Sequence, residues 1–455
     1  MRVLVWCFRS VFRSSDFRIW TLVAALIAPV AAFAQDAPSN IAPDPAFATI
    51  PFDQWITERD QPHFQWSARI SGGELASSQR LLARVEIQVD GNELLKRRGP
   101  GELVFFVQIQ DSDHRRFQSH GAIQLKDVTE AATKSNFVYT QGALVAPGDY
   151  RFELAVFDTQ SGEHATTERT LHVAPLKSDP LPDSWLGLPV VEFLEGGAPP
   201  DMWFQPNLTG RLHLPLKARR PVRVEVLVNA SPSAIGPRFR TGQVNNRSLA
   251  DLLPVLKVIS EVELSPGALN VSLVDLTRRQ VLFTQDHVDP RNQALDWPRL
   301  RPALRQADPN KIDVRDLAHR QQNAQFFVEE VRRRIVSEGV PGADSDSPGP
   351  ALIVLSGPMQ FASGEDLHQI ELAQRLPGRV FYIRYHPLPL RMRTEPLATR
   401  RNRGLGFPQP GIVVQEPPDA LEPLLKPLQP RLFDVNNPEQ FRRALAELMK
   451  EIARL

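Results

Sequence analysis

The chain has 455 residues, enough for two or three domains at roughly 100–200 residues each. Its apolar fraction of 42% is typical of globular proteins, and its 41 prolines favour β-domains, turns and stiff linkers over a helical bundle. The formal net charge of +1 gives no general basic field, which excludes the whole-protein electrostatics of a nucleic-acid-binding chain.

The N-terminus, residues 1–34, reads as a signal peptide. Four arginines in the first 18 residues precede the apolar run "IWTLVAALIAPVAAFA", and Ala32 and Ala34 fit the small-x-small cleavage rule before Gln35. The run has 16 residues, is shorter than the about 20 that span a bilayer, and is interrupted by Pro29. We therefore expect an exported protein, periplasmic or secreted, without a membrane span after cleavage; a retained anchor is the alternative.

The only cysteine, Cys7, lies inside this leader and before its apolar run. The mature chain is therefore expected to have no disulfide and no thiol for catalysis or metal binding. Its stability must come from its hydrophobic cores.

The first half of the mature chain has the pattern of an antiparallel β-sandwich. After a flexible tail at 35–50, residues 51–175 carry many short alternating strands, such as "LLARVEIQVDG", with turns between them. The segment "PGDYRFELAVFD" resembles the closing hairpin of immunoglobulin-like bacterial domains. The Pro- and Gly-rich residues 176–209 are expected to form a linker that is partly ordered through Trp185 and Phe193.

From residue 210 to 455 strands alternate with helices. "VRVEVLVNAS" is followed by the helical "RSLADLLPVLKVISEV", and "LNVSLVDLTRRQVLF" reads as two strands around a tight turn. "PALIVLSG" is a continuous apolar strand, as in sheets that helices cover on both faces. The pattern predicts an α/β doubly wound, mostly parallel sheet with one antiparallel edge strand.

This order resembles the von Willebrand factor A domain. The hairpin after the first helix, the "IVLSG" strand and the closing "RLFDVNNPEQFRRALAEL" fall where that family has its counterparts, over about 240 residues from Arg211 to Leu455. The resemblance implies a metal-ion-dependent adhesion site. In that site a D-x-S-x-S loop, a threonine and a second aspartate hold a dication that takes a carboxylate from the partner protein.

Carried over to this chain, the adhesion motif falls on "NASPS". Asn229 stands where the family has its aspartate, Ser231 and Ser233 are retained, and the second aspartate falls on Ser356. Mg²⁺ and Mn²⁺ sites usually supply one or two carboxylates, and both are neutral here. The resemblance therefore implies a degenerate site with no bound cofactor, and weak Mg²⁺ or Mn²⁺ binding is the alternative. Ser and Asn also cap turns after strands without any ligand.

Catalytic motifs are absent from the sequence. It contains no HExxH, no G-x-S-x-G elbow and no phosphate-binding G-x-x-x-x-G-K-[ST]. A hydrolase would depend only on Ser356 and His386, which both follow strands of the predicted sheet.

The segment from 386 to 411 looks like an insertion between sheet strands. It is either a solvated loop or a contact surface for an acidic partner. Its basic residues are Arg391, Arg393, Arg400, Arg401 and Arg403.

The sequence favours an exported, non-enzymatic protein–protein interaction module with a degenerate A-type domain. Its partner is expected to be an unidentified protein in the cell envelope or outside the cell, not a nucleic acid. A metal-dependent adhesion domain and an unrecognised hydrolase are the alternatives.

Overall fold

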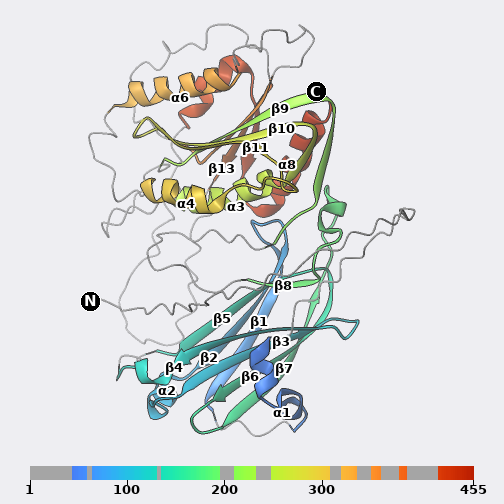
Figure 1. Cartoon of the computed structure of the whole chain (residues 1–455), viewed down its shortest axis with the longest axis vertical. Helices are drawn as coiled ribbons and strands as arrows, with labels where there is room; N and C mark the ends of the chain where they lie inside the picture. Colours follow the sequence, from blue (N-terminus) through green and yellow to red (C-terminus); the bar gives the residue numbers. More distant parts are fainter. Residues whose placement is uncertain are drawn as a thin grey trace, which may run out of the picture.

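The computed structural model describes residues 44–58, 64–130, 135–194, 210–231, 247–307, 319–335, 350–359, 379–386 and 419–455. The predicted signal peptide, 1–34, lies outside these ranges. Two bodies, a β-rich N-terminal one and a C-terminal one with strands and helices, follow one another along the long axis of the molecule (Figure 1). The expected multidomain organisation is therefore confirmed.

Two antiparallel sheets of four strands each form the N-terminal body. The first has the order β1 (Trp66–Leu75), β2 (Leu81–Val89), β5 (Phe137–Val145) and β8 (Val191–Phe193). The second has the order β4 (Arg116–Gln124), β3 (Glu102–Gln110), β6 (Gly148–Asp158) and β7 (His164–Val173). A short helix, α2 (Gly91–Lys96), connects β2 to β3. Inward residues of both sheets share one hydrophobic core, which confirms the alternating pattern read from the sequence.

The expectation of a flexible tail at 35–50 is wrong for residues 44–50. Residues Pro45–Thr49 form a 3-10 helix, and α1 (Phe52–Glu58) follows it. Both pack on the outer face of the second sheet, because their aromatic side chains are buried on apolar residues of β3 and β6. The buried aromatic residues of this segment are Phe47, Phe52 and Trp55. Residues 35–43 lie outside the described ranges.

The predicted linker, 176–209, is ordered in its first half and contributes to both bodies. A 3-10 helix covers Pro182–Trp185, and β8 extends the first sheet by pairing with Ala143–Val145. The Trp185 ring packs against the cores of both bodies. Residues 195–209 of this segment lie outside the described ranges.

The C-terminal body contains a six-stranded sheet with the order β11-β10-β9-β12-β13-β14. The strands are β9 (Leu214–Asn229), β10 (Val262–Asp275), β11 (Gln280–Val288), β12 (Ala351–Ser356), β13 (Arg379–Tyr385) and β14 (Arg431–Val435). All neighbours are parallel except β11, which is antiparallel to β10. Counted from β9 as the first, the order is 3-2-1-4-5-6, so the chain starts in the middle and winds outward in both directions.

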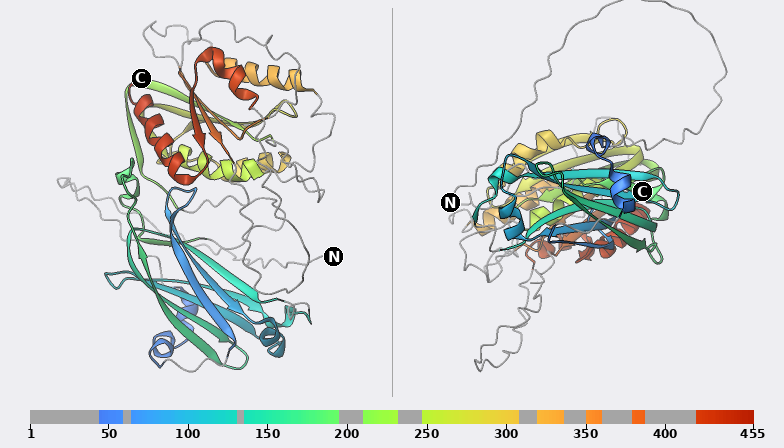
Figure 2. Two further views of the ribbon diagram at one scale, coloured as in Figure 1. Left: turned by 180° about the vertical axis from the view of Figure 1, so that it is seen from behind. Right: turned by 90° about the horizontal axis from the view of Figure 1, so that it is seen from below.

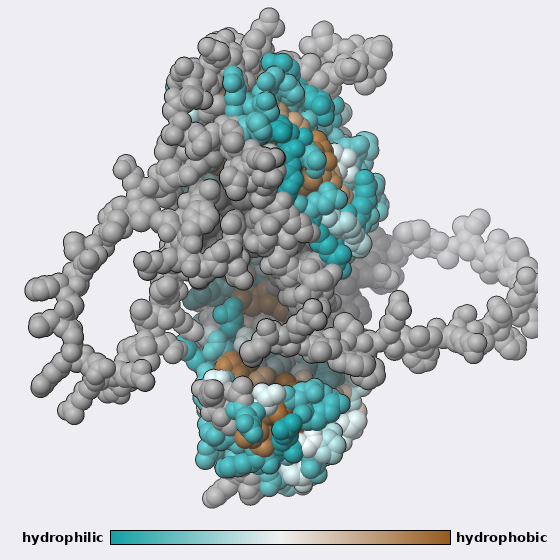
Figure 3. Space-filling view, turned by 90° about the vertical axis from the view of Figure 1, so that its left-hand side faces the viewer, coloured by the Kyte–Doolittle hydropathy of each residue, from teal (hydrophilic) through white to brown (hydrophobic). Residues whose placement is uncertain are grey.

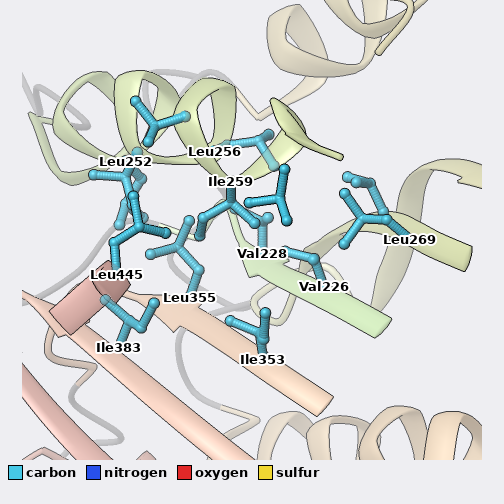
Figure 4. Close-up of a cluster of buried hydrophobic side chains, with 14 of the residues drawn as sticks. Val226, Val228, Leu252, Leu256, Ile259, Leu269, Ile353, Leu355, Ile383 and Leu445 are labelled. Atoms are coloured by element: carbon cyan, nitrogen blue, oxygen red, sulfur yellow. The ribbon is translucent and has the colours of Figure 1, made fainter. Parts of the chain in front are cut away.

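Helices cover both faces of this sheet (Figures 1 and 2). One face packs against α3 (Arg247–Ser260), α4 (Trp297–Gln306) and α8 (Pro438–Ile452), and the other against α6 (Arg320–Ile335) and α7 (Leu421–Leu425). Figure 4 shows the first of these cores, in which leucines of α3 lie on valines and isoleucines of the central strands. The mostly parallel sheet with one antiparallel edge strand is therefore confirmed.

On the face drawn in Figure 3, the visible part of the described surface is mostly hydrophilic, with smaller hydrophobic areas. The large hydrophobic side chains that remain exposed on it are Val138, Leu186 and Val281. Within the described ranges, no helix is both long enough and apolar enough to cross a bilayer.

Candidate functional site

The parallel strands of the second sheet deliver polar residues to one edge. β9 ends at Asn229, β10 at Asp275 and β12 at Ser356. In open α/β sheets ligands bind outside the carboxyl ends of the strands, where the strand order reverses. That point lies between β9 and β12, so Asn229 and Ser356 flank the place where the fold would hold a ligand.

The Asn229 side chain joins the ends of the two central strands. It is buried, and its Nδ2 donates to Ser356 Oγ at 2.9 Å and contacts Met359 Sδ at 3.2 Å. Its Oδ1 accepts the backbone N–H of Ser231 at 3.0 Å, which closes a turn directly after β9. Ser356 Oγ in turn donates to the carbonyl oxygen of Gly357 at 2.6 Å. The amide therefore holds two loops together.

Ser231 is tied to the hairpin between β10 and β11. Its hydroxyl donates to Asp275 Oδ1 at 3.3 Å and accepts the N–H of Leu276 at 2.7 Å. Asp275 is fully buried and accepts the backbone N–H groups of Thr277 and Arg278 at 2.9 and 3.1 Å. The Arg278 guanidinium binds its other oxygen at 2.5 Å. This carboxylate holds the hairpin turn.

Sequence reasoning missed Asp275. The available signal was its position at the end of a strand, followed by the turn residues Thr277 to Arg279, because an aspartate there often accepts hydrogen bonds from the next backbone N–H groups. Parallel neighbours end at the same edge, so its proximity to Ser231 followed from the sheet order that the sequence predicted.

The donor set does not fit the dication that the resemblance implies. The amide oxygen of Asn229 is engaged by a backbone N–H, and the Ser231 and Ser356 hydroxyls each accept one hydrogen bond and donate another. Asp275 is a carboxylate, yet four donors already surround it. Hard cations lose water reluctantly and need free anionic oxygens. Ser233 lies outside the described ranges. Within those ranges, no group of three or more His, Cys, Asp or Glu residues could hold a metal ion.

A second buried link organises the loop after β12. Tyr382 on β13 donates its hydroxyl to Asp419 Oδ2 at 2.8 Å, and Asp419 Oδ1 accepts the N–H of Met359 at 2.9 Å and that of Leu421 at 3.3 Å. Burial raises the pKa of Tyr382 well above its ordinary value, and the negative charge of Asp419 raises it further. The phenol therefore stays protonated and acts as a donor that fixes this loop beside α7.

Charged residues continue the same edge outward from β13. Arg384 pairs with Asp434 at 2.6 Å and with Glu422 at 2.7 Å, and Asp419 lies 3.5 Å away. Its hydrogen bond to Asp434 raises the pKa of Arg384. Burial alone would raise the pKa of Asp434, but hydrogen bonds from Arg384 and His386 outweigh it and lower that pKa. Sequence reasoning missed this network because its members come from three separate segments of the chain: the end of β13, the start of α7 and β14.

Ser356 and His386 are each hydrogen-bonded to another group. The Ser356 hydroxyl directs its proton to the Gly357 carbonyl oxygen. His386 lies on the neighbouring strand end, and its Nε2 is 3.1 Å from Asp434 Oδ1. A nucleophile needs a base within hydrogen-bonding reach of its own proton.

The predicted basic contact surface lies outside the described residues. It comprises Arg391, Arg393, Arg400, Arg401 and Arg403. It remains a prediction from the sequence.

Comparisons with known proteins identify no family for the chain. No family model matches it, and no curated protein matches it. Among solved structures, a structural-genomics target called SoR45 is 17% identical, with 25% of this chain and 89% of that chain covered and a TM-score of 0.17. A protein from Bordetella pertussis described as ApaA is 14% identical, with 26% of this chain and 100% of that chain covered and the same TM-score of 0.17. Likeness at this level defines neither fold nor function.

Proposed function

We propose that this chain is an exported, non-enzymatic interaction protein whose sandwich, of immunoglobulin-like type, supports a degenerate von Willebrand factor A-like domain. The sheet order, with its antiparallel edge strand after the first helix, supports the resemblance read from the sequence. The partner is a protein of the cell envelope or of the exterior, and no cofactor takes part.

The hydrogen bond from Asn229 Nδ2 to Ser356 Oγ carries this proposal. Both positions are those where the adhesion family keeps its aspartates, and here they bind each other. Buried polar groups that satisfy one another stabilise a loop arrangement and leave no open coordination position. Partner recognition then depends on surface contacts of loops and edges, without a bridging dication.

In-cell photo-crosslinking tests the proposal. A photoactivatable residue placed at Phe407 or Met392, inside the predicted basic loop, is expected to give discrete adducts in the native envelope. The same residue at Val138 on the sandwich serves as a surface control. Deleting residues 388–408 should abolish the adduct from a second probe at exposed Glu422 while leaving the melting temperature unchanged. Adducts equally abundant from all positions, or none from the C-terminal body, would refute the proposal.

Metal dependence is decided in the same cells. Adducts that persist after chelation with EDTA support the metal-free mechanism. If EDTA removes the adducts and Mg²⁺ or Mn²⁺ restores them, the alternative of a metal-dependent adhesion domain is correct, and the hydrogen bonds around Asn229 must rearrange on binding.

A further inference from the structure

The outer strand of the six-stranded sheet lies beside a groove that both apolar and polar side chains line. β11 is the last strand on its side among the described residues, with β10 as its neighbour. A groove of about 270 Å³ runs along β11 and α4. Its strand side consists of Val281, Leu282, Phe283 and Thr284, and its helix side of Arg299, Pro302, Ala303 and Gln306. Val281 is 38% exposed, which is unusual for a large aliphatic side chain of this surface.

The backbone of β11 has groups directed away from the sheet. Thr284 faces Ser272 across the β10–β11 pair, and its carbonyl oxygen accepts a hydrogen bond from Arg299 of α4 at 3.1 Å. We infer from this contact that the Thr284 C=O points away from β10, as at the pairs of an antiparallel ladder that exchange no hydrogen bonds. Because the N–H and C=O of one strand residue point to the same side, the N–H of Thr284 also faces outward. An edge of this kind can accept another extended strand.

The surroundings of this edge are basic. α4 carries Arg299, Arg301 and Arg305, all exposed, and has no acidic residue within its sequence "WPRLRPALRQ". The Arg299 guanidinium lies over the Phe283 ring, 5.3 Å from its centroid, so it borders the groove directly. The carboxylates of these two elements are Asp286 in β11 and Asp296, which caps the N-terminus of α4, against three arginines of α4. The excess of positive charge selects an acidic occupant.

We infer that β11 and α4 form a docking surface for an extended, acidic polypeptide segment, which adds to β11 as a further strand. Main-chain hydrogen bonds to the β11 edge supply affinity, an aliphatic side chain fills the groove beside Val281, and carboxylates pair with the arginines of α4. A second copy of this chain is a poorer occupant, because edge-to-edge pairing would bring two sets of α4 arginines together. This inference rests on the proposed interaction function and assigns it a surface.

Peptide selection on the purified full-length chain, processed by its own host, tests the inference. The probe is a display library of random nonapeptides, matched to the 9 residues of β11. The counter-target is the Thr284→Pro variant, which removes the outward N–H and leaves the ladder with β10 intact, as proline does on edge strands. Enriched peptides are expected to alternate aliphatic and acidic residues. Their affinity for the Thr284→Pro variant should be about tenfold lower than for wild type, or lower still.

Two further variants separate the components of binding. Arg301→Glu reverses one exposed charge and should weaken an enriched peptide, and added salt should weaken it in wild type. Arg443→Glu, on α8, is a control for an exposed arginine elsewhere and should have no effect. Circular dichroism and melting curves must match wild type for each variant.

Several outcomes would overturn the inference. Enrichment of basic or helical peptides, no enrichment over the counter-target, or equal binding to folded Thr284→Pro would each do so. Self-association that Thr284→Pro abolishes would assign the edge to a second copy instead. Crosslinked partners in cells that do not depend on Thr284 would leave the proposed function standing and remove only this surface.

Discussion

The guanidinium of Arg442 on α8 forms a bidentate ion pair with Asp179, 263 residues earlier in the chain, at 2.6 and 2.8 Å. The same side chain donates to the Leu181 carbonyl oxygen at 2.8 Å and to Ser184 Oγ at 2.7 Å, and it lies over the Trp185 ring. It is 2% exposed. One arginine of the C-terminal body therefore fixes the segment that enters from the sandwich.

The turn between β1 and β2 completes this joint. Gln79 Nε2 donates to the Pro438 carbonyl oxygen at 3.1 Å, and the Gln79 carbonyl oxygen accepts Trp185 Nε1 at 2.8 Å. In addition to the covalent connection, the two bodies are thus joined by hydrogen bonds from α8 and its first residue to the β1–β2 turn and to the 3-10 helix.

Arg442→Met should uncouple the two bodies. Breaking a buried, hydrogen-bonded ion pair by removing one partner costs about 3–5 kcal/mol, because the other charge, here that of Asp179, stays buried without an opposite charge beside it. Differential scanning calorimetry is expected to change from one cooperative transition to two. Arg443→Met is the matched control, since its side chain is exposed on the next position of the same helix. Identical thermograms for the two variants would show that the joint does not couple the bodies.

Acid should weaken the same joint. Burial alone would raise the pKa of Asp179, but hydrogen bonds from Arg442 and the Leu181 N–H outweigh it and hold the pKa below the ordinary 3.8. A carboxylate with a lowered folded pKa contributes stability that is fully present well above that ordinary value and disappears as pH falls through the folded pKa.

We therefore expect the difference in unfolding free energy between wild type and Asp179→Asn to be constant near neutral pH and to shrink below about pH 4. Urea denaturation at a series of pH values between neutral and strongly acidic measures it. Asp183→Asn, a neighbour with an exposed side chain, controls for loss of charge in the same segment. If the difference in unfolding free energy grew as the pH fell, the pKa of Asp179 would not be lowered in the folded protein.

The strands and helices could be predicted because their patterns are local. Alternation in β2 and the apolar run of β12 follow from which faces are buried, and both read clearly in the sequence. The joint could not be predicted in this way. Helical periodicity places Arg442 beside the apolar face of α8 and Arg443 opposite that face, but it does not give the partner of Arg442. The partner, Asp179, is set by how α8 packs against a distant segment.

Part of the candidate site could also be predicted from local sequence patterns. Strand ends of a parallel sheet meet at one edge, so Asn229 and Ser356 could be expected near each other, and the structure places them in a hydrogen bond. The roles of Asp275 and Asp419 could not be predicted, because a single aspartate beside a turn forms no recognisable motif. Their partners are set by loop conformation, which depends on contacts between distant segments.

Asn229→Asp should destabilise the protein instead of restoring an ion site. The amide Nδ2 donates to Ser356 Oγ in a buried position, and a carboxylate there cannot donate. Leaving buried groups unpaired costs about 1–3 kcal/mol, and more when one is charged. Thermal denaturation should show a lowered melting temperature that millimolar Mg²⁺ or Mn²⁺ does not recover.

Asn92→Asp is the matched control for this change. Asn92 is exposed in the first turn of α2, where a carboxylate is favourable, so its melting temperature should equal that of wild type. If Mn²⁺ raised the melting temperature of Asn229→Asp above that of the ion-free wild type, the pocket would be able to hold a dication, and the hydrogen-bonded arrangement would be only one of its states.

Trp55→Ala should loosen the N-terminal segment from the sandwich. The Trp55 ring stacks on His164, with centroids 4.2 Å apart, and contacts Phe157 at 5.1 Å. Truncating a buried tryptophan costs about 3–5 kcal/mol, because the apolar contact area and the packing around it are lost. We expect a lower urea midpoint together with increased binding of a hydrophobic dye, since Phe157 beneath Trp55 becomes accessible to water. Gln54→Ala, one position earlier and exposed, should change neither quantity. A Trp55→Ala protein as stable as this control would mean that α1 covers the sheet without contributing to its stability.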